Sequence, residues 1–340
     1  MKRYTIITIL LALLLTSCEK AFMDEDTGAT KEEVFEYLWT RIDQNYSLFD
    51  VKNVDWDSIH TVYQGRLRTV RNDAALFDLL SSMLNTLEDG HVNLYSDFDV
   101  SHDSRSFNGR YGRCNIDINV VAMNYLTSDY HVRSGFSYNT IRDGRVLYVR
   151  YSSFSNSASS DDLQAILDDN KRCQGLILDM RQNGGGSIEN IWNLLRLLPS
   201  ENQVLYKTQI KSGPAHDAFS ELEICKAPSN DSYSPYTKPV MVLTDRGSFS
   251  ATSFFALSCK SYNNVKLVGD TTGGGLGLPS GGQLPNGWYY RHSITRTLSP
   301  DGVNYENGVP PDHVVMIDTA STAAGKDNVI EKACDLILGL

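Results

Sequence analysis

Residues 175–187 read GLILDMRQNGGGS. The apolar run over 175–180 is typical of a strand that is buried on both faces. Three glycines follow, and we expect a helix over 187–198, so backbone N–H groups there can approach a developing oxyanion closely. A plain Gly-rich turn between a strand and a helix is the alternative. A phosphate-binding loop is excluded because no Gly-Lys-Ser/Thr follows.

Strands and helices alternate on either side of this stretch. The patterns predict strands over 116–121, 146–151, 204–210, 240–243 and 265–268, and helices over 159–169, 250–261 and 326–338. A hairpin is expected around Pro285-Asn286-Gly287, and an irregular surface stretch over 96–113. Such alternation predicts an α/β core with largely parallel strands.

The segment before this core is helical in pattern. Thr30 and Glu33 have the spacing of a capping box, and apolar residues then recur at helical spacing from Val34 to Tyr46. Two further helical patterns reach residue 88. Their aromatic stripes are better explained as core than as a cofactor site.

The first residues indicate export. A basic start, Lys2-Arg3, precedes an apolar run from Ile6 to Leu15, which is too short to span a membrane as a helix. Leu15-Thr16-Ser17-Cys18 is similar to a bacterial lipobox, in which Cys18 becomes the lipid-bearing N-terminus. The alternative is that Cys18 is only a small residue near an ordinary cleavage site.

The acidic charge balance argues against nucleic acid as a binding partner. Among 340 residues, 31 Lys and Arg face 41 Asp and Glu, a formal net charge of −10 that excludes nucleic acid as the expected partner. Cleavage before Cys18 would leave five cysteines, at positions 114, 173, 225, 259 and 334. They lack metal-ligand spacing, so no metal site is expected from them, and one disulfide pair stays open.

Two further segments carry residue types suited to nucleophilic catalysis. In Arg246-Gly247-Ser248-Phe249-Ser250-Ala251, Ser250 falls where a strand enters a helix, and the Ala251 amide would point to the same space. The alternative is that Ser248 or Ser250 only caps that helix. His91 follows a turn in Leu87–Leu94, but spacing alone does not select it among seven histidines.

A fourth segment is rich in glycine. Six glycines fall within residues 273–282, which indicates a mobile loop, either a lip over a substrate or a linker. Downstream, Glu306 lies between turn signals. It is either a carboxylate that orients an imidazole or an exposed loop acid.

In their order and spacing, these four segments resemble the tail-specific, or carboxy-terminal processing, serine peptidases and the related tricorn core protease. Residues 87–94 are similar to the family's Asp-Gly-His segment, and 178–186 to its Asp-x-Arg-x-Asn-Gly-Gly-Gly. Ser250-Ala251 matches the nucleophile and its successor, 19 residues before Gly269-Asp270. Residues 308–312 match the family's Gly-x-x-Pro-Asp ending.

The resemblance implies a fold and a set of roles. The fold is an α/β, crotonase/ClpP-like ββα spiral core with an N-terminal helical subdomain. Ser250 is then the nucleophile, His91 the general base and Glu306 the acid that orients it. The amides of Gly185 and Ala251 form the oxyanion hole, and the resemblance implies neither a metal nor a cofactor. The reaction would be hydrolysis of peptide bonds in extracytoplasmic proteins or peptides by a lipid-anchored enzyme of the bacterial cell envelope.

The expected organisation follows from these assignments. It comprises a signal peptide over 1–17, a polar tether over 18–28, a helical subdomain over 29–90, a β-rich connecting segment over 91–140, a peptidase core over 141–320 and a C-terminal helix over 321–340.

Two departures from the family pattern refine the mechanism. The lysine of the family's Ser-Lys members would fall at Gly275, so the tricorn-like route through His and Glu is the better match, although Gly90 stands where tricorn has a Ser. No PDZ segment is recognisable after His91. A peptide- or lipid-binding module on the same scaffold is the alternative function.

Overall fold

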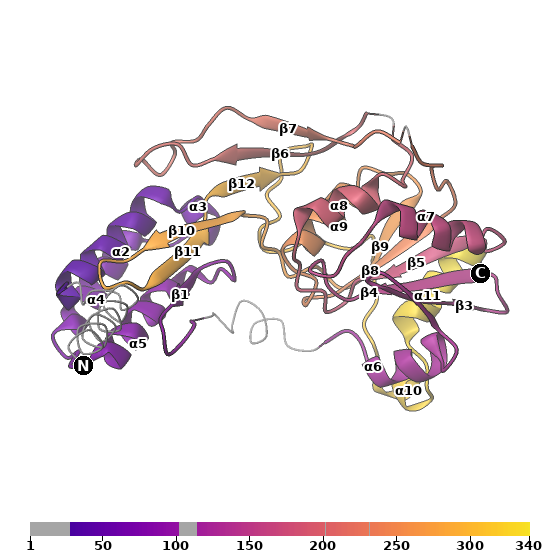
Figure 1. Ribbon diagram of the computed structural model, residues 1–340, viewed down its shortest axis with the longest axis horizontal. Helices are drawn as coiled ribbons and strands as arrows, with labels where there is room; N and C mark the ends of the chain where they lie inside the picture. The colour runs from indigo at the N-terminus through magenta and orange to yellow at the C-terminus, as the bar shows by residue number, and fades with distance from the viewer. Residues whose placement is uncertain (1–27, 102–113, 201, 231) are drawn as a thin grey trace, which may run out of the picture.

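The computed structural model describes residues 28–101, 114–200, 202–230 and 232–340. The expected signal peptide, nearly all of the tether with Cys18, and most of the irregular 96–113 stretch therefore lie outside the described residues. Figure 1 shows N-terminal helices at one end of an elongated molecule, a large sheet at the other end, and a ribbon of strands along the top between them.

The N-terminal helices form where the apolar spacing predicts them. They are α2 (Lys31–Asn45), α3 (Phe49–Lys52), α4 (Trp56–Leu67) and α5 (Asp73–Leu84), followed by the short turn η1 (Asn85–Leu87). Thr30 and Glu33 make both bonds of the expected capping box. Val34, Leu38, Ile42 and Tyr46 are all buried in one apolar cluster.

This cluster is completed by strands from distant parts of the chain. Strand β1 (Asn93–Tyr95) pairs with β11 (Tyr289–Ser293), which pairs in turn with β10 (Pro279–Gln283) as the predicted hairpin. Leu284, Trp288 and Tyr290 pack among the N-terminal helices. The segment that follows η1 and carries His91 is thereby held against the hairpin.

The large sheet has seven strands in the order β13-β9-β8-β5-β4-β3-β2. Their bounds are β2 (His131–Arg133), β3 (Phe136–Ile141), β4 (Val146–Tyr151), β5 (Gly175–Asp179), β8 (Val240–Thr244), β9 (Val265–Gly269) and β13 (His313–Val314). Strands β4, β5, β8, β9 and β13 run parallel, as the alternation predicts, whereas β3 is antiparallel to both of its neighbours, β2 and β4.

Helices cover both faces of this sheet, which explains why β5 and β8 are buried throughout. On one face Leu176, Leu178 and Val242 pack with α7 (Ser160–Asp169), α8 (Ile188–Leu195) and α9 (Ala251–Cys259). On the other, Ile177 and Met241 pack with α11 (Asn328–Leu338).

A third sheet, β12-β6-β7, forms the upper ribbon in Figure 1. It consists of β6 (Val204–Ile210), β7 (Glu223–Lys226) and β12 (Thr295–Leu298). Only Ile294 separates β12 from β11, so the chain passes directly from the hairpin beside the helices into this ribbon.

The strand expected over 116–121 is wrong. The structure has α6 (Ile118–Val121), continued by the π-helical turn η3 (Ala122–Leu126), and a short α10 (Thr319–Ala323) precedes α11. The Asp117 carboxylate accepts the N–H groups of Asn119 and Val120, so a local N-cap outweighs the alternating apolar pattern. In the described part of the 91–140 connecting segment, a helix thus takes the place of one expected strand.

Candidate active site

Ser250 stands at the start of α9, where the chain leaves the loop after β8. Its φ of 56° and ψ of −120° are sparsely populated by residues other than glycine, and its side chain makes no capping bond. The backbone is fixed on both sides, since Phe249 N–H donates to the Asn183 carbonyl at 3.0 Å and Ser250 N–H to the Gly274 carbonyl at 2.9 Å. The hydroxyl is therefore presented to the site instead of capping the helix.

The neighbouring serine has a structural role. The Ser248 hydroxyl is fully buried, donates to the Met180 carbonyl at 2.9 Å and accepts the Asp245 N–H at 3.0 Å. It ties the loop after β8 to the end of β5.

His91 lies in the segment between η1 and β1 and contacts Ser250. Its Nε2 lies 3.0 Å from Ser250 Oγ, and its ring packs against Phe249 with centroids 4.9 Å apart. A Cβ at Gly90 would lie 2.9 Å from the Phe249 ring, so the ring fills the space that a side chain at position 90 would need. Two residues 159 positions apart thus meet at hydrogen-bond distance.

The imidazole of His91 is held in its neutral form. Burial lowers its pKa, as do the charges of Arg291 and Lys52, while Asp89 and the Gly277 carbonyl act in the opposite direction. A neutral Nε2 facing a hydroxyl is the arrangement a general base requires. Among the described residues, Nδ1 makes no hydrogen bond of ordinary distance and angle.

The two residues expected to supply the oxyanion donors, Gly185 and Ala251, lie against Ser250. A Cβ at Gly185 would come within 2.8 Å of Ser250 Cβ and 3.0 Å of the Ala251 nitrogen, and the φ of Gly185 is +96°. Ala251 is the first residue of α9, so its N–H has no acceptor within the helix. The Gly185 N–H donates to Asn183 Oδ1 at 3.1 Å, and it would have to leave this acceptor to bind an oxyanion.

Glu306 is buried and not an exposed loop acid. Its carboxyl oxygen Oε2 accepts the N–H groups of Leu276 at 2.7 Å and Gly277 at 2.9 Å, so the Gly-rich loop wraps around it. Burial and the charge of Asp89 raise the pKa of Glu306 to about 8. Among the described residues no hydrogen bond joins this carboxyl group to His91. The structure therefore brings His91 and Ser250 together but leaves Glu306 without a direct hydrogen bond to either.

Residues that the sequence patterns do not single out surround this group. Asp89 is 2% exposed and contacts Tyr46 and Ser293. Lys52 Nζ donates to the Glu88 carbonyl at 3.0 Å and to Asn307 Oδ1 at 3.1 Å, and so connects the segments that carry His91 and Glu306. The one sequence signal for any of them is that Asp89 is the first residue of the Asp-Gly-His segment that contains His91.

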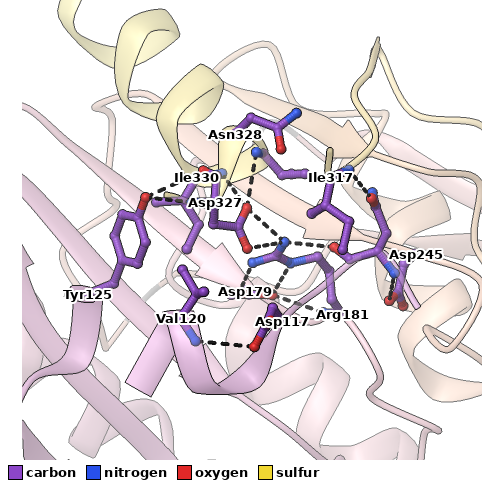
Figure 2. A network of polar contacts seen from close by, with 12 residues as sticks. Asp117, Val120, Tyr125, Asp179, Arg181, Asp245, Ile317, Asp327, Asn328 and Ile330 are labelled. Atoms are coloured by element: carbon purple, nitrogen blue, oxygen red, sulfur yellow. Dashed lines mark hydrogen bonds and ion pairs between the residues drawn. The ribbon is translucent and has the colours of Figure 1, made fainter. Parts of the chain in front are cut away.

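A second buried network supports the Gly-rich turn after β5. Figure 2 shows the Arg181 guanidinium between the carboxylates of Asp179 and Asp327. Arg181 is fully buried, its Nη2 lies 2.6 Å from Asp179 Oδ2, and its Nη1 lies 2.8 Å from Asp327 Oδ2 and from the Asn115 carbonyl. Because Asp327 caps α11, the network ties the C-terminal helix to the strand that leads into Gly185.

The described ranges contain neither a cluster of metal ligands nor a membrane-spanning helix. Residues 28–101, 114–200, 202–230 and 232–340 hold no group of three His, Cys, Asp or Glu side chains arranged for a metal ion. In those same ranges, no helix combines the length and the apolar character needed to cross a membrane. The five cysteines at 114, 173, 225, 259 and 334 are all free.

Comparison with known families gives two matches in different parts of the chain. The model of peptidase family S41 matches residues 145–315, which include β5, the Gly-rich turn, Ser250 and Glu306. The model of the tricorn protease C1 domain matches residues 27–85, the N-terminal helices.

Individual relatives agree with the family match. The carboxy-terminal processing protease CtpB of Bacillus subtilis is 27% identical over 156 residues, 46% of this chain and 30% of the relative. CtpA of the same organism is 26% identical over 176 residues, 51% of this chain and 36% of the relative. The chain thus spans about a third of the length of these curated relatives.

Solved structures extend the likeness to nearly the whole chain. A presumed peptidase of Parabacteroides merdae has a TM-score of 0.86 and 35% identity, covering 91% of this chain and 97% of its own. Mature CPAF shares the fold, with a TM-score of 0.66 at 13% identity over 91% of this chain and 98% of its own. With helices before a mixed α/β core, and a family match over half of its length, the chain belongs to peptidase family S41, a family of serine peptidases.

Proposed function

We propose that this chain is a serine endopeptidase in which Ser250 attacks and His91 takes its proton. The single observation that carries the proposal is the 3.0 Å contact between His91 Nε2 and Ser250 Oγ, made by a buried, neutral imidazole. A serine hydroxyl is a weak nucleophile unless an adjacent base removes its proton.

The chemistry follows from this pair. Ser250 Oγ bonds to the peptide carbonyl carbon while its proton moves to His91 Nε2, and the carbonyl oxygen becomes an oxyanion. The Ala251 and Gly185 amides stabilise that charge, the latter after leaving Asn183. Collapse breaks the C–N bond, and His91 gives its proton to the leaving amine. Water activated by His91 then hydrolyses the acyl-enzyme and regenerates Ser250.

Glu306 orients the base indirectly in this scheme. Its carboxyl holds the amides of Leu276 and Gly277, and the carbonyl of Gly277 is one of the groups that raise the pKa of His91. The absence of a lysine at position 275 supports the route through His and Glu, as does the tricorn C1 match over 27–85.

The finer assignments are part of the same proposal. The core is a crotonase/ClpP-like ββα spiral, supported by the parallel strands β4, β5, β8 and β9. The enzyme is held in the bacterial cell envelope by a lipid on Cys18 and acts on extracytoplasmic proteins or peptides. A structural neighbour from Streptococcus agalactiae, described as a lipoprotein, is in keeping with that anchor.

The test is turnover of an unstructured protein, such as casein, by the full chain and by Ser250→Ala, His91→Ala and Glu306→Gln. We expect hydrolysis by the wild type and its loss in Ser250→Ala and His91→Ala. Ser258→Ala is the matched control, because that hydroxyl lies at the far end of α9 and donates to the Phe254 carbonyl. Equal turnover by wild type and Ser250→Ala would refute the role of Ser250, and no turnover by either would favour the alternative, a binding module without catalysis.

A further inference from the structure

Asp89 is a buried carboxylate beside the base that the Ser250, His91 and Glu306 scheme does not use. It is 2% exposed and accepts hydrogen bonds from three donors. Oδ1 accepts the backbone N–H of His91 at 2.8 Å, while Oδ2 accepts the Ser293 hydroxyl at 2.8 Å and the Tyr46 hydroxyl at 3.1 Å. One carboxylate thus joins the end of α2, strand β11 and the segment that carries the base.

The contacts continue from Asp89 to Glu306. The Ser293 hydroxyl also lies 3.4 Å from the Gly277 carbonyl, and the Gly277 N–H donates to Glu306. A Cβ at Gly277 would lie 2.6 Å from Ser293 Cβ, so this close approach depends on glycine. A continuous path of polar contacts therefore runs from Glu306 through Gly277, Ser293 and Asp89 to the backbone of His91.

The charge of Asp89 is retained despite its burial. Burial opposes ionisation, but Lys52, His91 and the hydrogen bonds together lower the pKa of Asp89 below its ordinary value. An uncompensated buried carboxylate is costly, and an asparagine would accept the His91 N–H equally well. The hydrogen bond to the His91 N–H therefore does not by itself explain why position 89 carries a negative charge.

We propose that Asp89 is the positioning residue of His91, an inference that rests on the proposed function. It fixes the backbone of the base so that Nε2 meets Ser250, and it supplies the negative charge that stabilises the imidazolium formed during acyl transfer. Of the other groups near His91, Lys52 and Arg291 bear positive charge, and Glu306 is neutral at pH 7 and so contributes no negative charge.

The main test separates charge from shape. Asp89→Asn keeps an acceptor for the His91 N–H but removes the charge, whereas Asp89→Ala removes both. We expect kcat to fall at least about tenfold in Asp89→Asn and about 100-fold in Asp89→Ala, with KM within about twofold of wild type, because small displacements of a catalytic group cost on this scale.

The pH profile of kcat/KM separates the proposed role of Asp89 from a purely structural one, because loss of a structural contact alone would not shift it. The charge of Asp89 raises the pKa of His91, so in Asp89→Asn the acid limb of kcat/KM moves to lower pH. Loss of the Asp89 charge also favours ionisation of Glu306. Burial is the larger cause of the raised pKa of Glu306, however, and it remains in Asp89→Asn, so Glu306 does not take over the negative charge. Glu306→Gln leaves the acid limb in place.

Two milder variants keep the test decisive if Asp89 variants do not fold. Tyr46→Phe and Ser293→Ala each remove one hydrogen bond to Asp89, and kcat should fall about threefold to tenfold. Tyr63→Phe and Ser258→Ala are the matched controls, because each loses a hydroxyl bonded to a backbone carbonyl away from Asp89. Their kcat should equal that of the wild type.

The outcomes distinguish this inference from the function beneath it. A folded Asp89→Asn with wild-type kcat and an unmoved acid limb overturns the inference while Ser250→Ala is still inactive. Wild-type kcat in both Tyr46→Phe and Ser293→Ala overturns it as well. If Ser250→Ala is as active as the wild type, the proposed function itself fails.

Discussion

Replacement of Asp327 tests the buried network of Figure 2. The Asp327 carboxylate lies 2.8 and 3.1 Å from Arg181 Nη1, and its Oδ1 also accepts the N–H groups of Val329 and Ile330 at the start of α11. Asp327→Ala therefore removes a helix cap and leaves the fully buried Arg181 with Asp179 as its remaining close carboxylate.

The expected cost is the sum of two contributions. Breaking a buried ion pair by removing one partner costs about 3–5 kcal/mol, and losing an Asp N-cap costs about 1 kcal/mol. The free energy of unfolding should therefore fall by about 4–6 kcal/mol in Asp327→Ala. Asp327→Asn keeps a capping oxygen, so its loss should be smaller by the cost of the cap, about 3–5 kcal/mol.

Urea denaturation at pH 7.5 and 25 °C measures these differences. The matched control is Asp318→Ala, which removes the cap of α10, a bond to the Ser321 N–H at 2.8 Å in an exposed setting without a guanidinium. That variant should lose far less stability than Asp327→Ala, because its cap is exposed and leaves no buried charge behind. The reasoning is refuted if Asp327→Ala and Asp318→Ala lose the same amount.

Two further predictions concern the site. Between about pH 4.5, the ordinary pKa of a glutamate, and about pH 8, folded Glu306 keeps a proton that the unfolded chain has lost, so rising pH destabilises the fold. The free-energy difference between wild type and Glu306→Gln should then change with pH by up to about 1.4 kcal/mol per unit, and a pH-independent difference contradicts this. Gly185→Ala should lower kcat at least about 100-fold, because its Cβ would lie 2.8 Å from Ser250 Cβ at a φ of +96°. In Gly184→Ala, whose Cβ meets nothing within 4 Å, kcat should match wild type, and equal losses in both variants would show that the clash is not the cause.

Local patterns predicted the elements that carry the site. The buried strands at 175–179 and 240–244 and the capping box at Thr30 form as expected, because continuous apolar runs and caps depend on neighbours in sequence. The 116–121 segment failed for a local reason as well, since its alternating apolar residues suit a strand until the cap by Asp117 is counted.

The surroundings of His91 could not be predicted in the same way. Asp89 owes its contacts to Tyr46 and Ser293, which are 43 and 204 positions away in the chain. The burial of Glu306 depends on how the Gly-rich loop closes over it, with N–H donors 30 and 29 residues upstream. Such contacts arise from tertiary packing, and no spacing in the sequence encodes them.

Covalent labelling of Ser250 by a serine-reactive phosphonate tests the central claim most directly. It needs no knowledge of the substrate, because the probe reacts with a serine only where a base activates the hydroxyl. We predict one label on the full chain, mapped to Ser250 by peptide mass spectrometry, and absent from Ser250→Ala. In His91→Ala the labelling rate should fall at least about 100-fold. Unchanged labelling in His91→Ala, or none in the wild type, would contradict the account.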